Sequence, residues 1–290
     1  MKKNALLYIV IAGVLWGTSG IFVHFMSPMG FSTMHMIAAR SGVATLSILI
    51  YTLFYNRKLL KVKPKELLVF AASGISFLGT GSFYYAAIQA SSVSTAVILM
   101  YTAPIMVMIF SVAFLGERFT PKKFVSLTCM MIGCALVSGV VGGLTFSPLG
   151  IVLGLLSGIC YAAYNVITKV GMNYSYHPVT ATFYCFLTAF VFALMIAQPL
   201  QMGAIIAQNP LEAPLLMLGL GVVTCILPYF LYTLALREIP AGTASALGII
   251  EPMSATLFSV TLLGEALSVP AICGIVLILG AVFMLSRSNG

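Results

Sequence analysis

Aspartate is absent from this 290-residue chain, and charged side chains of every kind make up only 7% of it, while 61% of the residues are hydrophobic. A water-soluble domain needs far more charge than this to cover its surface. An intramembrane enzyme is also disfavoured, because three scattered histidines and no H-E-x-x-H or G-x-S-x-G motif offer no nucleophile or metal constellation. The composition therefore indicates a membrane protein that is not an enzyme.

Motifs for nucleotides, metals and disulfides are missing as well. No G-x-x-x-x-G-K-[ST] sequence occurs, so this chain does not hydrolyse ATP. The six cysteines all fall inside apolar stretches and none forms a C-x-x-C pair, which excludes a disulfide framework and a zinc site. We therefore expect no cofactor and no metal, and we interpret the cysteines as small packing residues.

What the chain has in abundance is long apolar runs bounded by glycine, proline or charge. A helix of about 20 apolar residues is long enough to cross a bilayer. Ten runs are candidates, and they cover residues 5–23, 33–55, 67–88, 93–114, 122–141, 148–168, 178–198, 214–234, 243–263 and 270–286. Lys2 and Lys3 resemble the start of a signal peptide, but no small-residue cleavage site follows. We predict an all-α membrane protein with ten transmembrane helices.

The positive charges orient these helices. Thirteen of the fourteen lysines and arginines fall at the chain ends or in loops on a single side of the membrane, and the fourteenth, Arg40, lies within a span. Loops rich in lysine and arginine stay in the cytoplasm. We therefore expect both termini there, and we interpret the surplus of 14 cations over 6 carboxylates as topological rather than as a surface for nucleic acid.

A segment of the fourth span recurs in the ninth, 148 residues later. The shared features are Thr95-Ala96, Pro104 and Gly116-Glu117 in the first copy, and Thr243-Ala244, Pro252 and Gly264-Glu265 in the second. A weaker match joins Gly13-x-Leu15-x-Gly17 to Gly154-x-Leu156-x-Gly158. Since the two copies lie five helices apart, they cross the membrane in opposite directions. The sequence thus predicts two inverted five-helix repeats, residues 1–145 and 146–290, around a central cavity.

Two ionisable residues, Arg40 and Glu251, fall inside spans. Such a side chain costs several kcal/mol in a bilayer unless it is paired or hydrated, and it indicates a functional site. Counting ~1.5 Å per residue from the helix ends puts the two ~8 Å apart in depth within a hydrocarbon layer of ~30 Å. We hypothesise that Arg40 attracts a substrate carboxylate and that Glu251 attracts a substrate ammonium or a proton. The alternatives are a buried ion pair, an Arg40 that snorkels outward, and a Glu251 that caps backbone opened by Pro252.

Pro104 and Pro252 sit in the middle of their spans, where each removes an N–H and disturbs the carbonyl one turn earlier. Kinked or broken helices at equivalent places in inverted halves indicate a binding site and hinges, although a proline kink can also simply fit the packing. The residue before the proline is Glu251 in the second copy and Ala103 in the first. The acidic group is therefore a single, asymmetric site.

Several of these residues together resemble the motifs of the EamA family of the drug/metabolite transporter superfamily: Trp16-Gly17, Arg40, Pro104 with Gly116-Glu117-Arg118, and Glu251-Pro252 with Gly264-Glu265. The resemblance covers nearly the whole chain. It implies ten helices, with helices one to four and six to nine around a central cavity and helices five and ten at the periphery. It also implies export of small metabolites, often amino acids, across a bacterial inner membrane.

The resemblance places further residues in cavity-lining helices: Trp16, Tyr84, Tyr101, Tyr161, Tyr164, Tyr232 and Asn165. Tyr161, Tyr164 and Asn165 follow an i, i+3, i+4 pattern and so share one helix face. A phenol in hydrocarbon needs a hydrogen-bond partner, which favours a hydrated cavity. The alternatives are an interfacial aromatic belt and ordinary packing. A wall of this kind suits a mid-sized, partly apolar substrate.

The remaining polar residues are expected to have structural roles. His24 and His35 bracket the first outer loop, so we expect exposed or interfacial imidazoles. Glu117 and Glu265 end their spans, where an anion is unfavourable, so we expect them to pair locally or to cap the turn. Glycines such as Gly133 pack a helix either inside the fold or against a second protomer.

These features predict a secondary transporter of the inner membrane that exports small metabolites, amino acids or related zwitterions, by alternating access. Its expected partners are a small-molecule substrate, the lipid bilayer and protons, without nucleic acid, and the expected state is a monomer or a homodimer. The alternative within this class is a carrier of organic cations, drugs or other metabolites, working as an importer or as an uncoupled facilitator. A channel is the alternative from another class, although no charge ring or carbonyl-filter signature occurs.

Overall fold

Helices form almost the whole of the described backbone. The computed structural model describes residues 3–116, 120–139, 147–174, 176–264 and 266–287, and no strand occurs in this part of the chain. The all-helical fold class is confirmed. Glu117 and Glu265 lie outside the described residues, so their expected roles stay predictions.

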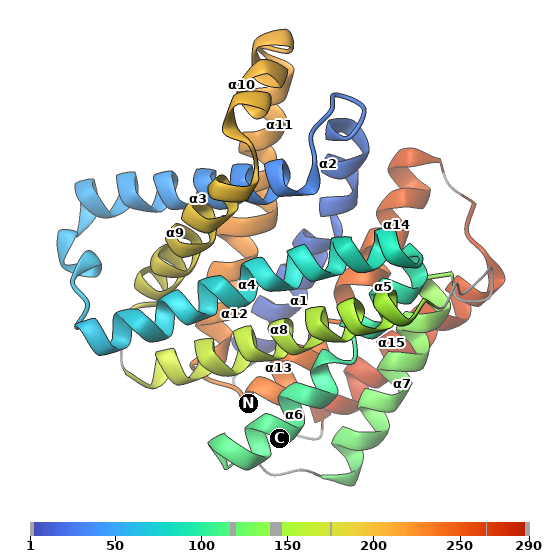
Figure 1. Cartoon of the computed structure of the whole chain (residues 1–290). Helices are drawn as coiled ribbons and strands as arrows, with labels where there is room; N and C mark the ends of the chain where they lie inside the picture. Colours follow the sequence, from blue (N-terminus) through green and yellow to red (C-terminus); the bar gives the residue numbers. More distant parts are fainter. Residues whose placement is uncertain (1–2, 117–119, 140–146, 175, 265, 288–290) are drawn as a thin grey trace.

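The elements follow one another with short connections (Figure 1). The first part of the chain forms α1 (Lys3–Gly17), α2 (Ser19–Met26), α3 (Thr33–Tyr55), the short turn η1 (Arg57–Leu60), α4 (Pro64–Ala90), α5 (Val93–Met100), α6 (Ala103–Leu115) and α7 (Pro121–Val137). The second part forms α8 (Pro148–Asn173), α9 (Pro178–Ile196), α10 (Pro199–Gln208), α11 (Glu212–Gly221), η3 (Val222–Ile226), α12 (Leu227–Leu236), α13 (Ala241–Leu247), α14 (Ile250–Leu263) and α15 (Val269–Arg287).

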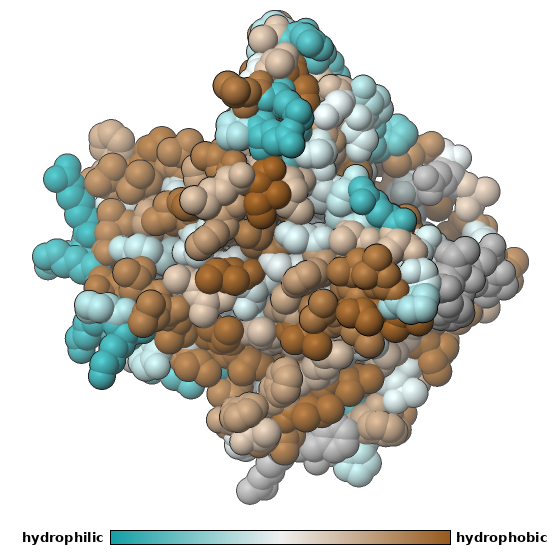
Figure 2. Space-filling view, viewed as in Figure 1, coloured by the Kyte–Doolittle hydropathy of each residue, from teal (hydrophilic) through white to brown (hydrophobic). Residues whose placement is uncertain are grey.

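Eight stretches of the described chain are long and apolar enough to cross a membrane. They are Asn4–Met26, Thr33–Tyr55, Pro64–Ala90, Thr95–Leu115, Pro148–Asn173, Pro178–Ile196, Glu212–Leu236 and Ala241–Leu263. The last predicted span corresponds to a shorter apolar helix, Val269–Leu285, and the fifth corresponds to α7, which has 17 residues. The prediction of ten spans is therefore supported for eight, and the count of ten stays a prediction. Apolar residues cover much of the visible surface (Figure 2).

Hydroxyl side chains begin several of these helices. Ser92, Thr120 and Ser147 each accept a hydrogen bond from the backbone N–H three residues later, which satisfies a free donor of α5, α7 and α8. At the start of α3 the Ser32 hydroxyl accepts from the His35 N–H, and the His35 ring accepts from the Ser32 N–H. His35 is only 3% exposed. The expectation of an exposed His35 is wrong, because this reciprocal cap folds the ring back onto the helix start, and its interfacial depth stays a prediction.

The two copies of the duplicated segment are broken at equivalent positions. Two residues separate α5 from α6, and two separate α13 from α14. Pro104 and Pro252 lie in the first turn of the second helix of each pair. A proline cannot donate to the carbonyl four residues before it, and its ring clashes with that carbonyl. The prediction of a kinked or broken helix at each proline is therefore confirmed as a break between two helices, with each proline where a missing N–H costs little.

One helix lies where the sequence predicts only a connection. The predicted spans leave residues 199–213 as a link, but α10 occupies most of it and lies beside α11 at one end of the molecule (Figure 1). Its Met202, Ile205 and Ile206 pack against a small buried cluster that includes Met26. Ten residues are too few to cross a bilayer, so hydropathy alone could not separate α10 from a loop.

The helices of the two parts of the chain pack in matching pairs. α4 packs against α8, and α1 packs against α12. α5 and α6 also pack against α8, as α14 packs against α1. α3 pairs with α9, and α7 pairs with α15. The contact of α4 with α8 thus has the contact of α12 with α1 as its counterpart, with the two parts of the chain exchanged. The pairs α3 with α9 and α7 with α15 are each their own counterpart.

Glycines permit the closest of these helix crossings. A Cβ atom at Gly17 of α1 would lie 2.8 Å from the backbone nitrogen of Ala255 in α14, and one at Gly154 of α8 would lie 2.7 Å from a side-chain carbon of α5. A Cβ atom at Gly133 of α7 would lie 2.8 Å from the carbonyl oxygen of Gly274 in α15. Gly133 therefore packs inside the fold, which is the first of the two alternatives for this glycine.

Candidate functional site

A cavity of about 460 Å³ lies between helices from both parts of the chain. Of the residues that the sequence proposes for substrate binding or hinges, eight line it: Trp16, Arg40, Tyr84, Tyr101, Tyr161, Tyr164, Glu251 and Pro252. They come from α1, α3, α4, the break between α5 and α6, α8, and α14. Only the fold brings these residues together, since more than 230 positions separate the first from the last.

Asn165, Tyr232 and Pro104 lie outside this lining. The Tyr232 hydroxyl donates to Asn165 Oδ1, and both side chains are 0% exposed. The amide nitrogen of Asn165 donates to the Tyr161 carbonyl at 2.7 Å, so both ends of the amide are satisfied. Asn165 and Tyr232 thus join α8 to α12 inside the protein instead of facing the cavity. Pro104 of α6 is also buried inside the protein.

Sequence reasoning missed part of the cavity wall, which also includes Ser19, Phe77, Thr80, Ser138 and Tyr229. The ring centroid of Tyr229 lies 5.0 Å from that of Trp16 and 5.2 Å from that of Phe77. It also lies 5.7 Å from that of Tyr164, so Tyr229 is the centre of an aromatic cluster. Its position falls 148 residues after Gly81, another lining residue, and this repeat offset was the available signal. Phe77 carried no such signal.

Arg40 lies against the face of an aromatic ring at the wall of the cavity. Its guanidinium carbon lies 4.8 Å from the centroid of Phe77, which is a cation–π contact. Its Nε is buried and has no hydrogen-bond partner. Among the described side chains, none forms an ion pair with Arg40, Glu251 included. A guanidinium in this state retains donors for an external carboxylate.

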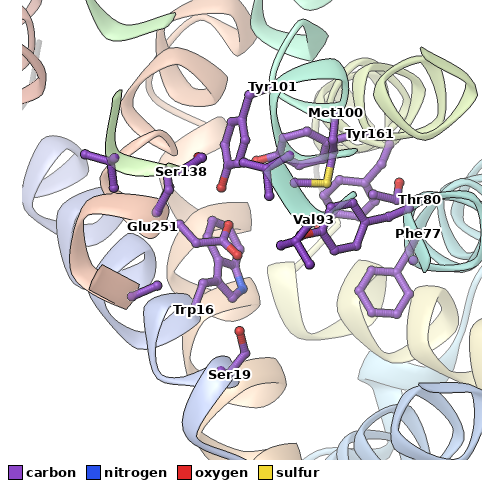
Figure 3. Close-up of a pocket in the computed structure, with 18 of the residues that line it drawn as sticks. Trp16, Ser19, Phe77, Thr80, Val93, Met100, Tyr101, Ser138, Tyr161 and Glu251 are labelled. Atoms are coloured by element: carbon purple, nitrogen blue, oxygen red, sulfur yellow. The ribbon is translucent and has the colours of Figure 1, made fainter. Parts of the chain in front are cut away.

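Glu251 is the acidic group of the cavity and the second residue of α14. The positive end of a helix dipole stabilises an anion at that position. The Tyr101 phenol is a hydrogen-bond partner of its carboxylate, and Figure 3 shows Glu251 between Tyr101 and Trp16. The indole Nε1 of Trp16 is also buried without a partner. The described residues bring together no group of three His, Cys, Asp or Glu side chains that could hold a metal ion.

The cavity extends toward one side of the helix bundle. Its lining includes Val93, the first residue of α5, and Ser138, which directly follows α7. Toward the other side, the Lys169 ammonium in the last turns of α8 donates to the carbonyl of Leu236 and, at 2.9 Å, to that of Ile239. These contacts tie α8 to the end of α12 on the side away from the cavity. The cavity lining thus reaches the end of the helix bundle where α5 begins.

Known proteins and a protein family match this chain over nearly its whole length. The sequence model of the EamA-like transporter family matches residues 3–139 and 148–287. A transporter from Archaeoglobus fulgidus described as uncharacterized is 30% identical over 286 residues, which cover 96% of this chain and 95% of that protein. The threonine/homoserine exporter RhtA of Salmonella typhimurium is 27% identical over 246 residues, which cover 81% of this chain and 79% of the exporter.

A solved crystal structure shares the fold. It superposes with a TM-score of 0.80 at 17% identity, and the match covers 99% of each chain. At this identity the likeness concerns the arrangement of the helices alone.

Proposed function

Because this chain belongs to the EamA-like transporter family, we propose that it is a secondary carrier that exports small metabolites, namely amino acids or related zwitterions, by alternating access. Family membership makes the chain a multi-pass membrane transporter and not an enzyme. The proposal adds the chemical class of the substrate, the direction of transport and the mechanism. We further propose a bacterial inner membrane with both termini in the cytoplasm, and a monomer or homodimer.

The observation that carries the substrate class is one guanidinium and one carboxylate in the same partly aromatic cavity. A substrate carboxylate matches the two-pronged geometry of Arg40, whose face is already covered by Phe77. A substrate ammonium matches Glu251, and the Trp16 ring beside it attracts a cation. A zwitterion uses both groups, whereas an organic cation uses only Glu251. The exporter RhtA, named for threonine and homoserine, supports the same class by relationship.

Paired features of the fold support the inverted repeat and hence the mechanism. The helices broken before Pro104 and Pro252 occupy equivalent positions in the proposed halves, residues 1–145 and 146–290. The exchanged packing pairs are what two inverted halves would produce. Gly17 of α1 contacts the second broken helix, and Gly158 of α8 contacts the first, which gives the weak match around these glycines a physical basis. Alternating access would then be an exchange of conformations between the halves.

A proton competes with a substrate ammonium for the same Glu251 carboxylate, which offers a route to coupling. Protonation cancels the attraction for the ammonium, so a bound substrate and a bound proton exclude each other at this residue, and release of the substrate goes with uptake of a proton. In that scheme the breaks before Pro104 and Pro252 are hinges, and Arg40 holds the carboxylate end of the substrate in both states. Downhill export of an accumulated metabolite needs no coupling, and the carrier can work without it.

Counterflow in proteoliposomes tests this proposal. Wild-type protein is compared with Glu251→Gln and with the control Glu212→Gln, which removes an exposed carboxylate from the first turn of α11. A hydrogen bond to a charged group contributes about 1.5–3 kcal/mol, so Glu251→Gln should lower exchange of an α-amino acid about 10- to 100-fold. Glu212→Gln should exchange at the wild-type rate. Full exchange by Glu251→Gln would remove this residue from the mechanism, and flux that does not saturate would indicate a channel.

A substrate series separates the two charged groups. The α-hydroxy analogue of the amino acid lacks the ammonium, and the amide of the amino acid lacks the carboxylate. We expect Glu251→Gln to lower the exchange of the amino acid relative to wild type and to leave the exchange of its α-hydroxy analogue unchanged. Arg40→Gln should lower the exchange of the amino acid relative to wild type and leave the exchange of its amide unchanged. If both variants lose every compound equally, the charges support the fold and the zwitterion assignment fails.

A further inference from the structure

The turn between α3 and α4 holds the densest charge of the chain. Residues 57–65 carry five of the fourteen cations, all on exposed side chains: Arg57, Lys58, Lys61, Lys63 and Lys65. One carboxylate, Glu66, follows in the first turn of α4. The other charged residues described by the structure occur singly or in pairs along the chain. We call residues 57–65 the basic turn.

The backbone of the basic turn is fixed to α9. The Thr180 hydroxyl donates to the Leu59 carbonyl at 2.8 Å, and the Tyr184 hydroxyl donates to the Leu60 carbonyl at 2.6 Å. The Lys63 N–H donates to the Tyr176 hydroxyl at 3.3 Å. A turn held in this way fixes where its side chains leave the backbone, so an outside ligand meets cations gathered in one place.

The cations of the basic turn have little to bind within the protein. In the described part of the chain, no carboxylate or carbonyl engages the ammonium groups of Lys58, Lys61, Lys63 or Lys65. Arg57 uses its Nε to donate to the Leu53 carbonyl at 3.3 Å. The Glu66 Oε2 is buried without a hydrogen-bond partner, and its single negative charge stands against the five cations of the turn. The positive charge is therefore directed outward.

An exposed aromatic and aliphatic surface borders the cluster. Tyr51 and Tyr55 stack with ring centroids 5.2 Å apart at the end of α3. Phe54 is 90% exposed beside them, and Leu68 of α4 is 71% exposed. Figure 2 shows the hydrophilic residues gathered at the left margin, over the turn between α3 and α4, next to apolar surface. Aromatic rings beside cations are typical of the boundary between lipid headgroups and acyl chains.

We propose that the basic turn binds the headgroups of anionic phospholipids. The cations match the phosphate charge, and the adjoining aromatic and aliphatic residues match the upper acyl chains of the same lipid. These apolar residues lie near the ends of the candidate spans Thr33–Tyr55 and Pro64–Ala90, so the cations stand at the level of the lipid headgroups, where phospholipid phosphates are the nearest anions. Since the turn is fixed to α9, a bound lipid would also stabilise the junction of α3, α4 and α9. This inference concerns a surface remote from the cavity and does not depend on the transported substrate.

Lipid exchange into nanodiscs tests the proposal with full-length protein. The probes are discs of phosphatidylcholine alone and discs of phosphatidylcholine mixed with phosphatidylglycerol, and the readouts are the melting temperature and the phosphatidylglycerol retained in native mass spectrometry. Wild-type protein should melt at a higher temperature in the mixed discs and should retain phosphatidylglycerol selectively. A basic residue near a lipid surface contributes enough that Lys61→Gln/Lys63→Gln should lower this retention about fivefold or more.

A matched variant controls for net charge. Lys122→Gln/Arg237→Gln also removes two exposed cations, at the start of α7 and just after α12, and should retain phosphatidylglycerol as the wild type does. Equal loss in both variants would show a net-charge effect and overturn the assignment to the basic turn. Equal retention of phosphatidylcholine and phosphatidylglycerol by the wild type would also overturn it. If inorganic phosphate stabilises the detergent-solubilised protein as much as phosphatidylglycerol does, the site takes a free anion and the lipid assignment fails.

Discussion

The two copies of the duplicated segment share a backbone plan and differ in which part faces the cavity. In the first copy, the cavity is lined by residues of α5 and by the first residue of the break: Val93, Val97, Met100 and Tyr101. In the second copy, the residues after the break line it: Glu251, Pro252, Ala255 and Thr256. α5 and α14 therefore form the wall, while α6 and α13 do not contribute to it.

The counterpart positions, 148 residues away, are buried. Ser245 and Gly248, which correspond to Val97 and Met100, lie in the core, as do Ala103 and Met108, which correspond to Glu251 and Thr256. Apart from Tyr101, which is 3% exposed, the cavity-lining residues are thus more exposed than their buried counterparts. If the halves exchange conformations, the buried set of each copy becomes the exposed set, and the structure represents one of two states.

The largest expected effect comes from placing an acid on the buried side of the first copy. Ala103→Glu puts a carboxylate at the position equivalent to Glu251, but Ala103 is 0% exposed. An uncompensated buried charge costs about 3–5 kcal/mol, so we expect a strong loss of thermal stability in detergent. Val97→Glu, in the same copy but on the cavity side, should melt near the wild-type temperature. Similar losses of thermal stability in both variants would contradict the assignment of Ala103 to the buried side and Val97 to the cavity side.

Much of the fold could be predicted from the sequence, because bilayer thickness fixes the length of a spanning helix and the repeat fixes the pairing. The breaks themselves were less accessible. A proline predicts a disturbance one turn earlier, but whether the helix bends or ends depends on what satisfies the released carbonyls. α10 was beyond reach for another reason, since its stability comes from packing on α11 and on Met26 rather than from its own hydropathy.

The charged residues of the cavity could be found from the sequence because charge in a span is rare and costly. Arg40 and Glu251 needed only a hydropathy profile. Aromatic residues are harder, because packing and substrate contact use the same side chains. Asn165 shows the limit: it shares a helix face with Tyr161, yet its amide turns to Tyr232 of α12 while the Tyr161 side chain lines the cavity. The neighbouring helix, which local spacing cannot supply, decides between the two.

The glycines that contact the broken helices allow the two copies to be compared through smaller effects on stability. A Cβ at Gly17 would lie 2.8 Å from the Ala255 backbone nitrogen, which cannot move aside, whereas one at Gly158 would lie 3.0 Å from the nearest atom, the Leu99 carbonyl oxygen. Overpacking costs about 1–3 kcal/mol, so Gly17→Ala should lower the melting temperature. Gly158→Ala should change it less, because the higher helix propensity of alanine contributes about 1 kcal/mol in the other direction. A larger loss for Gly158→Ala would reverse the assignment of the tighter contact.

Labelling of single cysteines measures the exposure contrast directly. In a background without native cysteines, Val97→Cys should react with a soluble maleimide about tenfold faster than Ser245→Cys, because thiol reactivity follows access to the thiolate. A substrate gradient that drives exchange should slow the first reaction and speed the second together. If Ser245→Cys stays unreactive under every gradient while transport continues, the second copy does not open in the way that the first is open here.

The smallest effect on stability is expected at the two prolines. Comparing them distinguishes a role as a hinge from a position in the cavity wall. Pro104 and Pro252 both lie in the first turn of a helix, where a restored N–H gains little, so Pro104→Ala and Pro252→Ala should each change the free energy of unfolding by less than about 1 kcal/mol. As hinges, both should slow exchange, because alanine allows the broken helix to continue across the break. Only Pro252 lines the cavity, so only Pro252→Ala should also change the apparent KM. Counterflow rates at several substrate concentrations distinguish these outcomes. Wild-type rates in both variants would leave the breaks as fixed features of the packing, and the exchange of exposure between the copies would then need another pivot.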